Sequence, residues 1–256
     1  MMEGMATADL LPLLQTGHLE LVGLLPWSSN YTFLVKITGQ VGDREGAIEV
    51  EAVYKPRRGE RPLWDFPNGT LCQRELASFI ISRALGWELV PLTVLREGPH
   101  GLGSLQLFVN HDPERHYLTF EGDPLLRPQL QQIALFDILI NNADRKSGHV
   151  LLQVQGHTDG RDRLWTIDHG ICFHTEAKLR TVIWEFAGQP IPAPLLHSLA
   201  LFQAALCEQN GALRAELAGL LTEAELLALQ KRAQRLLVEA KFCHPGPGRH
   251  YPWPPI

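Results

Sequence analysis

The segment LFDILINNADRKSGHVLL, which runs from Leu135 to Leu152, joins two apolar stretches through one short polar turn. The first stretch ends at Asn141 and Asn142, and apolar residues resume at Val150. The turn between them carries four charged or ionisable side chains: Asp144, Arg145, Lys146 and His149. Loops that carry charge and are held by rigid elements on both sides are frequent positions for catalytic groups. We therefore predict that this turn belongs to a functional site.

A second acidic turn follows in the segment WTIDHG, from Trp165 to Gly170. Its aspartate, Asp168, lies 24 residues after Asp144 and follows another short apolar segment. Two such carboxylates favour a pair in which one is a base and the other a metal ligand. No H-E-x-x-H or H-x-x-E-H spacing accompanies them, so the histidines give no indication of zinc.

The bulk composition narrows the function classes. The 256 residues suit one large domain or two small lobes. The net charge of −5 provides no basic footprint, so we expect no nucleic-acid partner. The cysteines are scattered without a C-x-x-C pair, which is typical of reduced thiols in a cytoplasmic protein. No apolar run approaches membrane-spanning length, so we predict a soluble chain with no integral membrane segment.

Alternating apolar and polar residues predict five antiparallel strands in the first part of the chain. Thr70 and Gln73 have the spacing of a capping box, which predicts a helix from there to a stop at Gly86. Further helices are predicted at 128–140 and 222–242. The predicted strands begin near five positions: His18, Tyr31, Ala47, Val90 and Ser104.

The residue pattern of the chain changes from strand-forming to helix-forming near residues 110–112. A second capping box, Thr222 and Glu225, opens the last predicted helix. The predicted fold class is α+β with two lobes, a small β-rich lobe with one helix and a mainly helical lobe. The predicted divisions are an N-terminal leader that is either a short helix or loosely docked (1–17), an N-lobe (18–110), a C-lobe (111–243) and a proline-rich tail (244–256).

Four charged residues come in an order that suits phosphoryl transfer. Lys55 ends a predicted strand, and Glu75 lies 20 residues later in the first turns of a helix. Asp144 and Asp168 follow in the two acidic turns. Phosphotransferases use a strand lysine paired with a helix glutamate, an aspartate at the acceptor and an aspartate on the metal. Taken singly, Lys55 is more often a solvated lysine and Asp168 an Asx turn, but the order of all four favours phosphoryl transfer.

On these residues the chain resembles the protein-kinase-like superfamily, specifically its phosphatidylinositol 3- and 4-kinase-like branch and bacterial relatives of that branch. The resemblance rests on NNADRKSGH at 141–149 and IDHG at 167–170, supported by Lys55 in VYKP and Glu75 in RELA. It implies a two-lobed kinase-like fold, ATP with Mg²⁺ or Mn²⁺ as cofactors, and transfer of the γ-phosphoryl group to a hydroxyl. The acceptor stays open among small molecules, lipids and proteins.

The resemblance also implies roles for single residues. Lys55 would contact the α/β-phosphates, and Glu75 would steady it. Asp144 would accept or orient the acceptor's proton, with Arg145 and Lys146 beside it in the catalytic turn.

Further implied roles concern the nucleotide and the metal. Asp168 would hold the metal between phosphates. Ser28 and Ser29, at a hairpin tip, would offer hydroxyls and backbone N–H groups to the β/γ-phosphates. The run from Gln106 through Phe108 would supply the hinge that reads adenine.

The chain departs from the kinase pattern at several points. It has no G-x-G-x-x-G and no His-Arg-Asp, and His149 occupies the position where kinases have a metal-binding asparagine. Mg²⁺ prefers oxygen ligands, whereas imidazole suits Mn²⁺ better. The hypothesis is therefore either one metal on Asp168 with His149 in an outer role, or a preference for Mn²⁺.

Two other functions stay open at this point. The same lobes transfer AMP if ATP binds in the flipped orientation, or they form a nucleotide-binding pseudokinase. The segment that holds Lys178 and Arg180 occupies the position of an activation segment, where it either binds an anionic substrate or is a solvated basic turn.

Overall fold

The computed structural model describes residues 7–25, 30–42, 46–155 and 160–256. The chain divides into two compact units, one made of residues 1–76 and 91–108, the other of 77–90 and 109–256. Helix α2 (Leu71–Ala84) continues from the first unit into the second. The four-part division expected from the sequence remains a prediction, and the two observed units are described separately.

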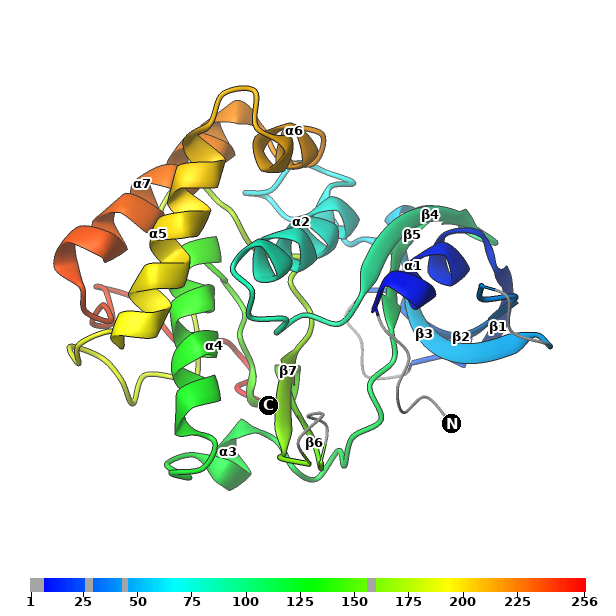
Figure 1. The fold of residues 1–256 in the computed structure, drawn as a ribbon, viewed down its shortest axis with the longest axis horizontal. Coiled ribbons are helices and arrows are strands. Elements are labelled where there is room, and N and C mark those ends of the chain that lie inside the picture. Colours follow the sequence, from blue (N-terminus) through cyan, green and yellow to red (C-terminus); the bar gives the residue numbers. More distant parts are fainter. Residues whose placement is uncertain (1–6, 26–29, 43–45, 156–159) are drawn as a thin grey trace. The chain divides into compact units, whose positions relative to one another are not determined.

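The first unit is built on a five-stranded antiparallel sheet with the order β1-β2-β3-β5-β4. Figure 1 shows the sheet curved around helix α1 (Thr7–Thr16). The five predicted strands are thus confirmed. Their bounds are β1 His18–Leu24, β2 Phe33–Gly39, β3 Ile48–Pro56, β4 Thr93–Gly98 and β5 Gly101–Leu107.

Period-two patterning explains how this sheet buries one face. Val35 and Ile37 of β2 and Ala52 of β3 are fully buried, whereas the residues between them are more exposed. Helix α1 covers the sheet with buried leucines, and the Arg96 guanidinium donates to the carbonyl of Leu14 at 3.0 Å. Residues 7–16 of the expected leader therefore form a docked helix.

Helix α2 begins differently from the prediction. The carboxylate of Glu60 accepts hydrogen bonds from the backbone N–H groups of Leu71 at 3.1 Å and Cys72 at 2.9 Å. The Thr70 hydroxyl donates instead to the Pro67 carbonyl at 2.8 Å. The predicted capping box of Thr70 and Gln73 is thus wrong, because an ionised carboxylate from the preceding loop takes the free N–H groups and also favours the helix dipole.

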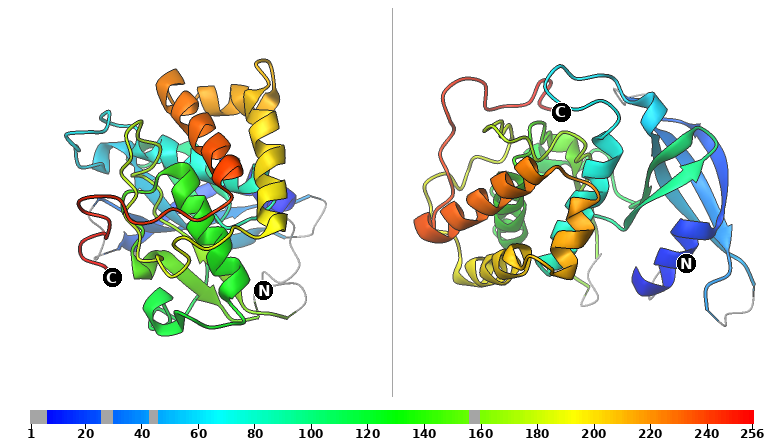
Figure 2. Two further views of the ribbon diagram at one scale, coloured as in Figure 1. Left: turned by 90° about the vertical axis from the view of Figure 1, so that its left-hand side faces the viewer. Right: turned by 90° about the horizontal axis from the view of Figure 1, so that it is seen from above.

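The second unit is mainly helical, and Figures 1 and 2 show α4, α5 and α7 packed side by side. Residues 133–140 of α4 are all buried, so this helix forms the centre of the unit. The predicted capping box of Thr222 and Glu225 is confirmed at the start of α7. The helices are α3 Tyr117–Phe120, α4 Arg127–Ile140, α5 Ala193–Cys207, α6 Ala212–Ala218 and α7 Glu223–Glu239, with single 3-10 turns η1 at Arg57–Gly59 in the first unit and η2 at Ser147–His149 in the second.

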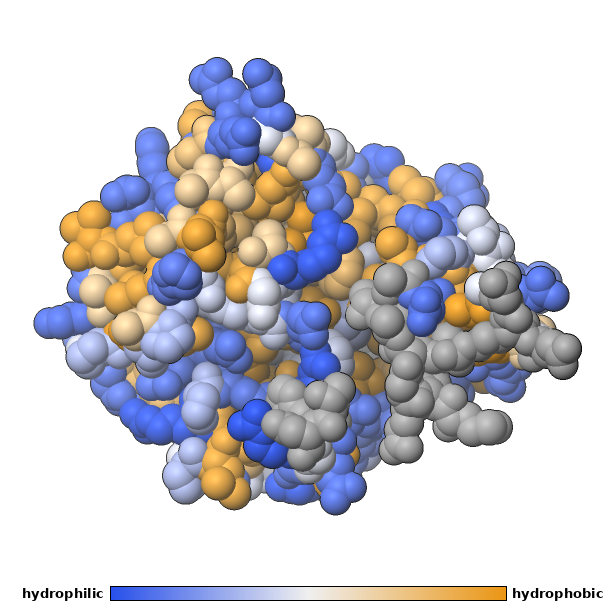
Figure 3. All heavy atoms as spheres, viewed as in Figure 1, coloured by the Kyte–Doolittle hydropathy of each residue, from blue (hydrophilic) through white to orange (hydrophobic). Residues whose placement is uncertain are grey.

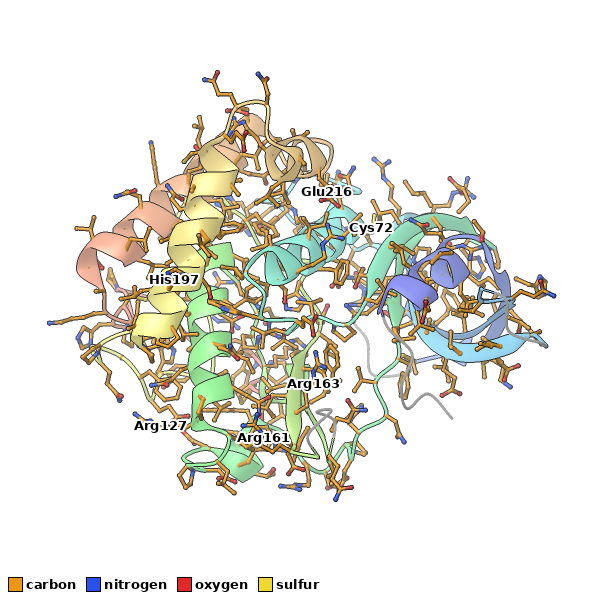
Figure 4. All side chains as sticks on the ribbon, viewed as in Figure 1. Cys72, Arg127, Arg161, Arg163, His197 and Glu216 are labelled. Carbon is orange, nitrogen blue, oxygen red and sulfur yellow. The ribbon has the colours of Figure 1, made fainter. Side chains whose placement is uncertain are left out.

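A short antiparallel hairpin of β6 (Val150–Gln153) and β7 (Arg163–Thr166) positions the two acidic turns. Val150 pairs with Thr166, so the turn that precedes β6 and the turn that follows β7 lie at the same end of the hairpin. The guanidinium of Arg163, labelled in Figure 4, lies 3.6 Å over the Trp165 ring and covers one side of β7.

The surface of the second unit mixes hydrophobic and hydrophilic side chains. Figure 3 shows hydrophobic side chains over α5 beside charged ones, and Leu201 of α5 is 60% exposed. Single exposed apolar residues of this kind are normal for a folded chain. In the part of the chain that the structure describes, no helix is both long and apolar enough to span a bilayer.

Candidate active site

The turn between α4 and β6 is organised by its two asparagines. Asn141 ends α4 with a left-handed conformation (φ 54°), which asparagine tolerates better than most residues. Its side-chain amide donates to the carbonyls of His174 at 2.9 Å and Glu176 at 2.6 Å, and its Oδ1 accepts from the backbone N–H of Lys178 at 2.9 Å. Asn141 therefore ties the segment after the second acidic turn to the end of α4.

Asn142 shapes the turn itself. Its Oδ1 accepts the backbone N–H of Asp144 at 2.9 Å, and its Nδ2 donates to Asp137 Oδ1 at 3.0 Å. An Asx turn of this kind fixes the direction in which the next side chain leaves the backbone. The position of Asp144 is thus set from α4.

Arg145 is fully buried and joins several elements. Its guanidinium contacts both oxygens of Asp137 on α4 at 3.0–3.1 Å and donates to the carbonyl of Ile167 at 2.8 Å and to that of His149 at 3.2 Å. A further contact of 2.8 Å reaches Nε2 of His169, which accepts because arginine only donates. These contacts join α4, the first acidic turn and the second.

Asp144 is partly buried and lies beside Lys146, with 3.8 Å between the carboxylate and the ammonium. The pKa of Asp144 is raised to about 6, chiefly by burial and also by the negative charge of Asp168. The charges of Lys146, Arg249 and Arg145 act in the opposite direction. A carboxylate with a pKa in this range is suited to proton transfer near neutral pH.

His149 contacts both acidic turns. Its Nδ1 lies 3.0 Å from the backbone carbonyl of Asp144, and its Nε2 lies 3.3 Å from Oδ2 of Asp168. Asp168 itself has a left-handed backbone (φ 60°). The imidazole therefore joins the backbone of the Asp144 turn to the carboxylate of Asp168, and the described residues hold no cluster of three or more acidic, histidine or cysteine side chains able to bind a metal.

In the first unit, Lys55 and Glu75 form an ion pair. Lys55 Nζ lies 2.5 Å from Glu75 Oε1, with the lysine at the end of β3 and the glutamate in the first turns of α2. The carboxylate is nearly fully buried, whereas the lysine keeps partial contact with solvent. A buried carboxylate fixes the direction of a flexible lysine stem.

The remaining predicted site residues have varied positions. The side chain of Gln106 is buried on β5, and its amide donates to the Thr93 hydroxyl at 2.9 Å. The backbone N–H of Phe108 donates to the carbonyl of Glu51 at 3.0 Å. Ser28 and Ser29 lie outside the described residues.

Several residues that shape this site were missed in the sequence. Asp137, Asn141, Asn142 and His169 all hold the acidic turns in place. One signal was available for Asp137, because a carboxylate within the apolar run LFDILI needs a buried cation. Nothing in the spacing distinguished the asparagines from ordinary helix-ending residues.

Comparisons with solved structures identify the fold. The chain is similar to the Golgi casein kinase in its crystal structure with Mn/ADP bound, with a TM-score of 0.57, 17% identity, and coverage of 98% of this chain and 80% of that chain. It is also similar to hydra Fam20 with sugar, with a TM-score of 0.58, 15% identity, and coverage of 91% of this chain and 88% of that chain. The chain therefore has a mixed α and β kinase-like fold.

Comparisons with known sequences add relatives. Phosphatidylinositol 4-kinase gamma 4 of Oryza sativa subsp. japonica is 31% identical over 128 residues, which cover 43% of this chain and 22% of that protein. No protein-family model matches the chain. Protein Rv2133c of Mycobacterium tuberculosis is 40% identical over 274 residues, which cover 94% of this chain and 93% of that protein. This chain belongs to the same family as Protein Rv2133c.

Proposed function

We propose that the chain is an ATP-dependent phosphotransferase of the atypical kinase type, which moves the γ-phosphoryl group of ATP to a hydroxyl. The observation that carries the proposal is the contact of His149 with both the Asp144 turn and the Asp168 carboxylate. The ion pair of Lys55 and Glu75 supplies a second part that phosphoryl transfer needs. The likeness to a kinase described with Mn/ADP bound supports the same assignment.

In this proposal the charged groups have separate tasks. The Asp144 carboxylate accepts or orients the proton of the acceptor hydroxyl, because its raised pKa of about 6 suits a base near neutral pH. Lys55 holds the α- and β-phosphates by charge, and Glu75 keeps its ammonium in position. Lys146 is assigned to the phosphoryl group in transfer because its ammonium lies beside Asp144.

Asp168 and His149 suit a shared divalent cation. Nδ1 of His149 lies 3.0 Å from the carbonyl oxygen of Asp144 and 3.4 Å from the backbone N–H donor of Lys146, and Nε2 lies 3.3 Å from the Asp168 carboxylate. In the tautomer with the proton on Nδ1, Nε2 and the carboxylate are two acceptors that a divalent cation can join, and the hydrogen bond from Nδ1 to the carbonyl supports a ligand histidine. A bound Mg²⁺ or Mn²⁺ would neutralise charge on the phosphate oxygens.

We assign Arg145 a positioning role in place of the catalytic role expected from the sequence. Its side chain is fully buried and bonded to Asp137, to His169 and to two backbone carbonyls. A guanidinium bonded in this way fixes the geometry of the acidic turns and has no surface for a substrate. The hinge role of Gln106 and Phe108 and the phosphate role of Ser28 and Ser29 stay part of the proposal.

A test of the function uses ATP labelled at either the α- or the γ-phosphate. With a panel of lipid, sugar and protein acceptors, we expect the γ-label to reach the acceptor. The Asp144→Asn variant should lower turnover by about 10²–10⁴-fold and leave ATP affinity within about 3-fold, because a base acts on the rate and not on binding. Lys36→Gln, which removes a charge on the exposed face of the sheet, serves as the control and should leave both values unchanged.

The outcomes separate this function from its rivals. Transfer of the α-label would overturn phosphoryl transfer in favour of AMP transfer. Saturable ATP binding without transfer of either label, in wild type and variant alike, would indicate a pseudokinase.

The phosphatidylinositol 3- and 4-kinase-like branch remains our assignment within the superfamily. It is supported by the 31% identity to phosphatidylinositol 4-kinase gamma 4 and by 35% identity over 83 residues to phosphatidylinositol 4-kinase gamma 3 of Arabidopsis thaliana, which cover 14% of that protein. Since these matches span a small part of each relative, a lipid acceptor is tested in the panel beside sugars and proteins.

A further inference from the structure

A cavity of about 1070 Å³ lies within the second unit, on the side of α7 that faces the segment after the second acidic turn. Its walls come from four separate parts of the chain: the end of α4, residues 175–184, the start and middle of α7, and residues 243–250. A volume of this order accommodates a small organic ligand and is too large to be a packing defect.

The walls of this cavity are cationic. Glu176 is the anionic residue among those that line it, and its carboxylate lies 3.9 Å from the ammonium of Lys178. The net charge of the whole chain is −5, so cations gathered here contrast with the rest of the molecule. Six lining residues are cationic: Lys178, Arg180, Lys231, Arg232, Arg235 and Arg249.

Two of these cations have buried N–H groups that lack an acceptor in the described part of the chain. Arg232 donates from Nε to the Leu139 carbonyl at 2.8 Å and from Nη1 to the His174 carbonyl at 3.3 Å, but its Nη2 is buried and unsatisfied. The Nε of Arg180 is also buried and unsatisfied. An unmet buried donor costs about 1–3 kcal/mol, and more when it is charged. Arg180 and Arg232 therefore keep buried positive charge at the wall of the cavity, which an anionic ligand in the cavity would stabilise.

Burial also makes the positive charge of Arg232 less favourable. The pKa of Arg232 is lowered to about 10, chiefly by desolvation and also by the nearby charge of Arg235, while Cys172 and Glu225 act in the opposite direction. The carboxylate of Glu225 is itself bonded to Thr222 at the start of α7, so it is committed to the helix cap. An anionic ligand would relieve the repulsion between Arg232 and Arg235.

We propose that this cationic cavity binds a small ligand that carries two or three phosphate groups. The lining residues sum to a formal charge of about +5, and each phosphate monoester contributes roughly −1.5 to −2 at neutral pH. Guanidinium groups match phosphate oxygens in a bidentate manner, which favours phosphate over a diffuse negative surface. The proposal does not depend on phosphotransfer, because it rests on the cavity and the cationic side chains that line it.

The cavity shares a wall with the candidate active site. The backbone N–H of Arg180 donates to Asn142 O, and Arg180 O accepts from the backbone N–H of Arg145, both at 2.9 Å. Arg249 lies in the C-terminal segment, which joins this wall where the backbone N–H of Thr181 donates to the His250 carbonyl at 3.2 Å, and its charge lowers the pKa of Asp144. The C-terminal segment closes this wall, since the carbonyl of His250 accepts from the indole N–H of Trp184 at 3.1 Å. A ligand in the cavity would thus lie next to the acidic turns.

The test is isothermal titration calorimetry of the full chain, at about 0.15 M salt, where contacts between exposed charges are largely screened. Inositol 1,4,5-trisphosphate and fructose 1,6-bisphosphate are the multiply phosphorylated probes, and inorganic phosphate is the single-phosphate probe. We expect saturable binding of the first two at one site, and binding of inorganic phosphate weaker by about 100-fold or more, since separate phosphates do not share one scaffold.

Lys231→Gln and Arg235→Gln test the location. Neither Lys231 nor Arg235 has an ion-pair partner among the described residues, so both changes should preserve the fold, unlike a change of Arg232, which also bonds to two carbonyls. Each should weaken probe binding by about 10-fold. Lys241→Gln is the matched control, because Lys241 is exposed and lies outside the cavity, and it should change binding by less than about 2-fold. ATP affinity should be unchanged in all three variants.

Binding to lipid vesicles distinguishes a free ligand from a lipid headgroup. Vesicles with a phosphorylated inositol lipid that bind better than the soluble headgroup would assign the cavity to a membrane ligand with the same phosphate chemistry. If vesicles with phosphatidylserine as their only anionic lipid bind as well as those with the phosphorylated inositol lipid, the proposal is overturned. Equal weakening of probe binding by Lys231→Gln and Lys241→Gln would also overturn it. So would the absence of saturable binding of either multiply phosphorylated probe. A negative result would leave the phosphotransfer assay unaffected.

Discussion

Two ion pairs in this protein differ in what they leave for a ligand. Arg145 and Asp137 are both 0% exposed, and the guanidinium contacts two carbonyls and a histidine as well as the carboxylate. Lys55 is 21% exposed and is held by Glu75, which is 4% exposed. The first pair directs its donors inward and fixes backbone, whereas the second presents a cation to solvent. Burial of charge therefore separates the scaffold of the site from the groups that we propose touch the nucleotide.

The three aspartates of the candidate site also differ in burial. Asp137 is fully buried against Arg145, while Asp144 is 29% exposed and Asp168 is 47% exposed. Asp144 and Asp168 both keep contact with solvent, and His149 joins the backbone of one to the carboxylate of the other. A carboxylate that must exchange protons or ligands cannot be enclosed as Asp137 is.

The largest effect is expected when the scaffold pair is broken. Arg145→Ala leaves Asp137 buried without its cation, which should lower the free energy of unfolding by about 3–5 kcal/mol. Urea-induced unfolding followed by circular dichroism measures the change. Arg145→Lys should recover only part of it, because an ammonium does not reproduce the bidentate contacts to Asp137. A loss below about 1 kcal/mol for Arg145→Ala would contradict the scaffold role.

Breaking the second pair should act mainly on binding. Lys55→Met removes the exposed cation and should weaken ATP binding by about 10–100-fold, at a cost in stability smaller than that of Arg145→Ala. Calorimetric titration with ATP and a divalent cation measures the affinity. Lys36→Gln, on an exposed pair with Glu49 in the same sheet, is the matched control. If both lysine variants bind ATP as the wild type does, Lys55 has no nucleotide role.

The pKa of Asp144 predicts a pH-dependent stability. Because its pKa in the folded chain is raised to about 6, from 3.8, the folded state holds the proton more tightly than the unfolded state. The stability linked to that proton is fully present below about pH 4 and is lost as the pH rises through about 6. Asp144→Asn avoids this loss, so its advantage over wild type should grow between pH 4 and 6 and then level off at about 1–2 kcal/mol, allowing for partial solvent exposure.

Unfolding curves in urea, recorded between pH 4 and 8 without divalent cations, measure this difference. A wild-type and an Asp144→Asn chain of equal stability at every pH would show that Asp144 is not destabilised by burial. Turnover of the wild type should also fall as the pH drops below about 6, because the base becomes protonated.

The smallest expected effect concerns the choice of metal. His149→Asn replaces an imidazole beside Asp168 by an amide oxygen, which suits Mg²⁺ better than Mn²⁺. The ratio of Mn²⁺-supported to Mg²⁺-supported turnover should fall by about 3–10-fold. Assays of both metals at saturating concentration provide the ratio. An identical ratio in wild type and variant would remove His149 from the metal site.

Local patterning explains how much of the fold was predictable. Alternation of apolar residues placed all five strands, and the spacing of Thr222 and Glu225 placed the start of α7, because these signals depend on neighbours in the chain. The same local logic failed at α2, where Glu60 reaches the helix from a loop and replaces the expected cap. A partner from elsewhere in the chain is invisible to a spacing rule.

The candidate site shows the same limit more sharply. Residue order along the chain nominated Lys55, Glu75, Asp144 and Asp168, because phosphoryl transfer needs such charges on such elements, and their roles stay a prediction. Residue order did not show that the side chain of Arg145 is fully buried while that of Asp144 is partly exposed, because burial depends on the packing of α4 and the hairpin.

The cationic cavity depends wholly on long-range packing. Its walls come from segments near residues 138–141, 175–184, 224–235 and 243–250, and in sequence each has only a few basic residues of ordinary appearance. Charges become a binding site when folding brings them within a few ångströms in a space that excludes water, because the attraction for an anion then adds over all of them. Sequence order can nominate single residues, but the combined attraction of these cations for an anion exists only in the folded chain.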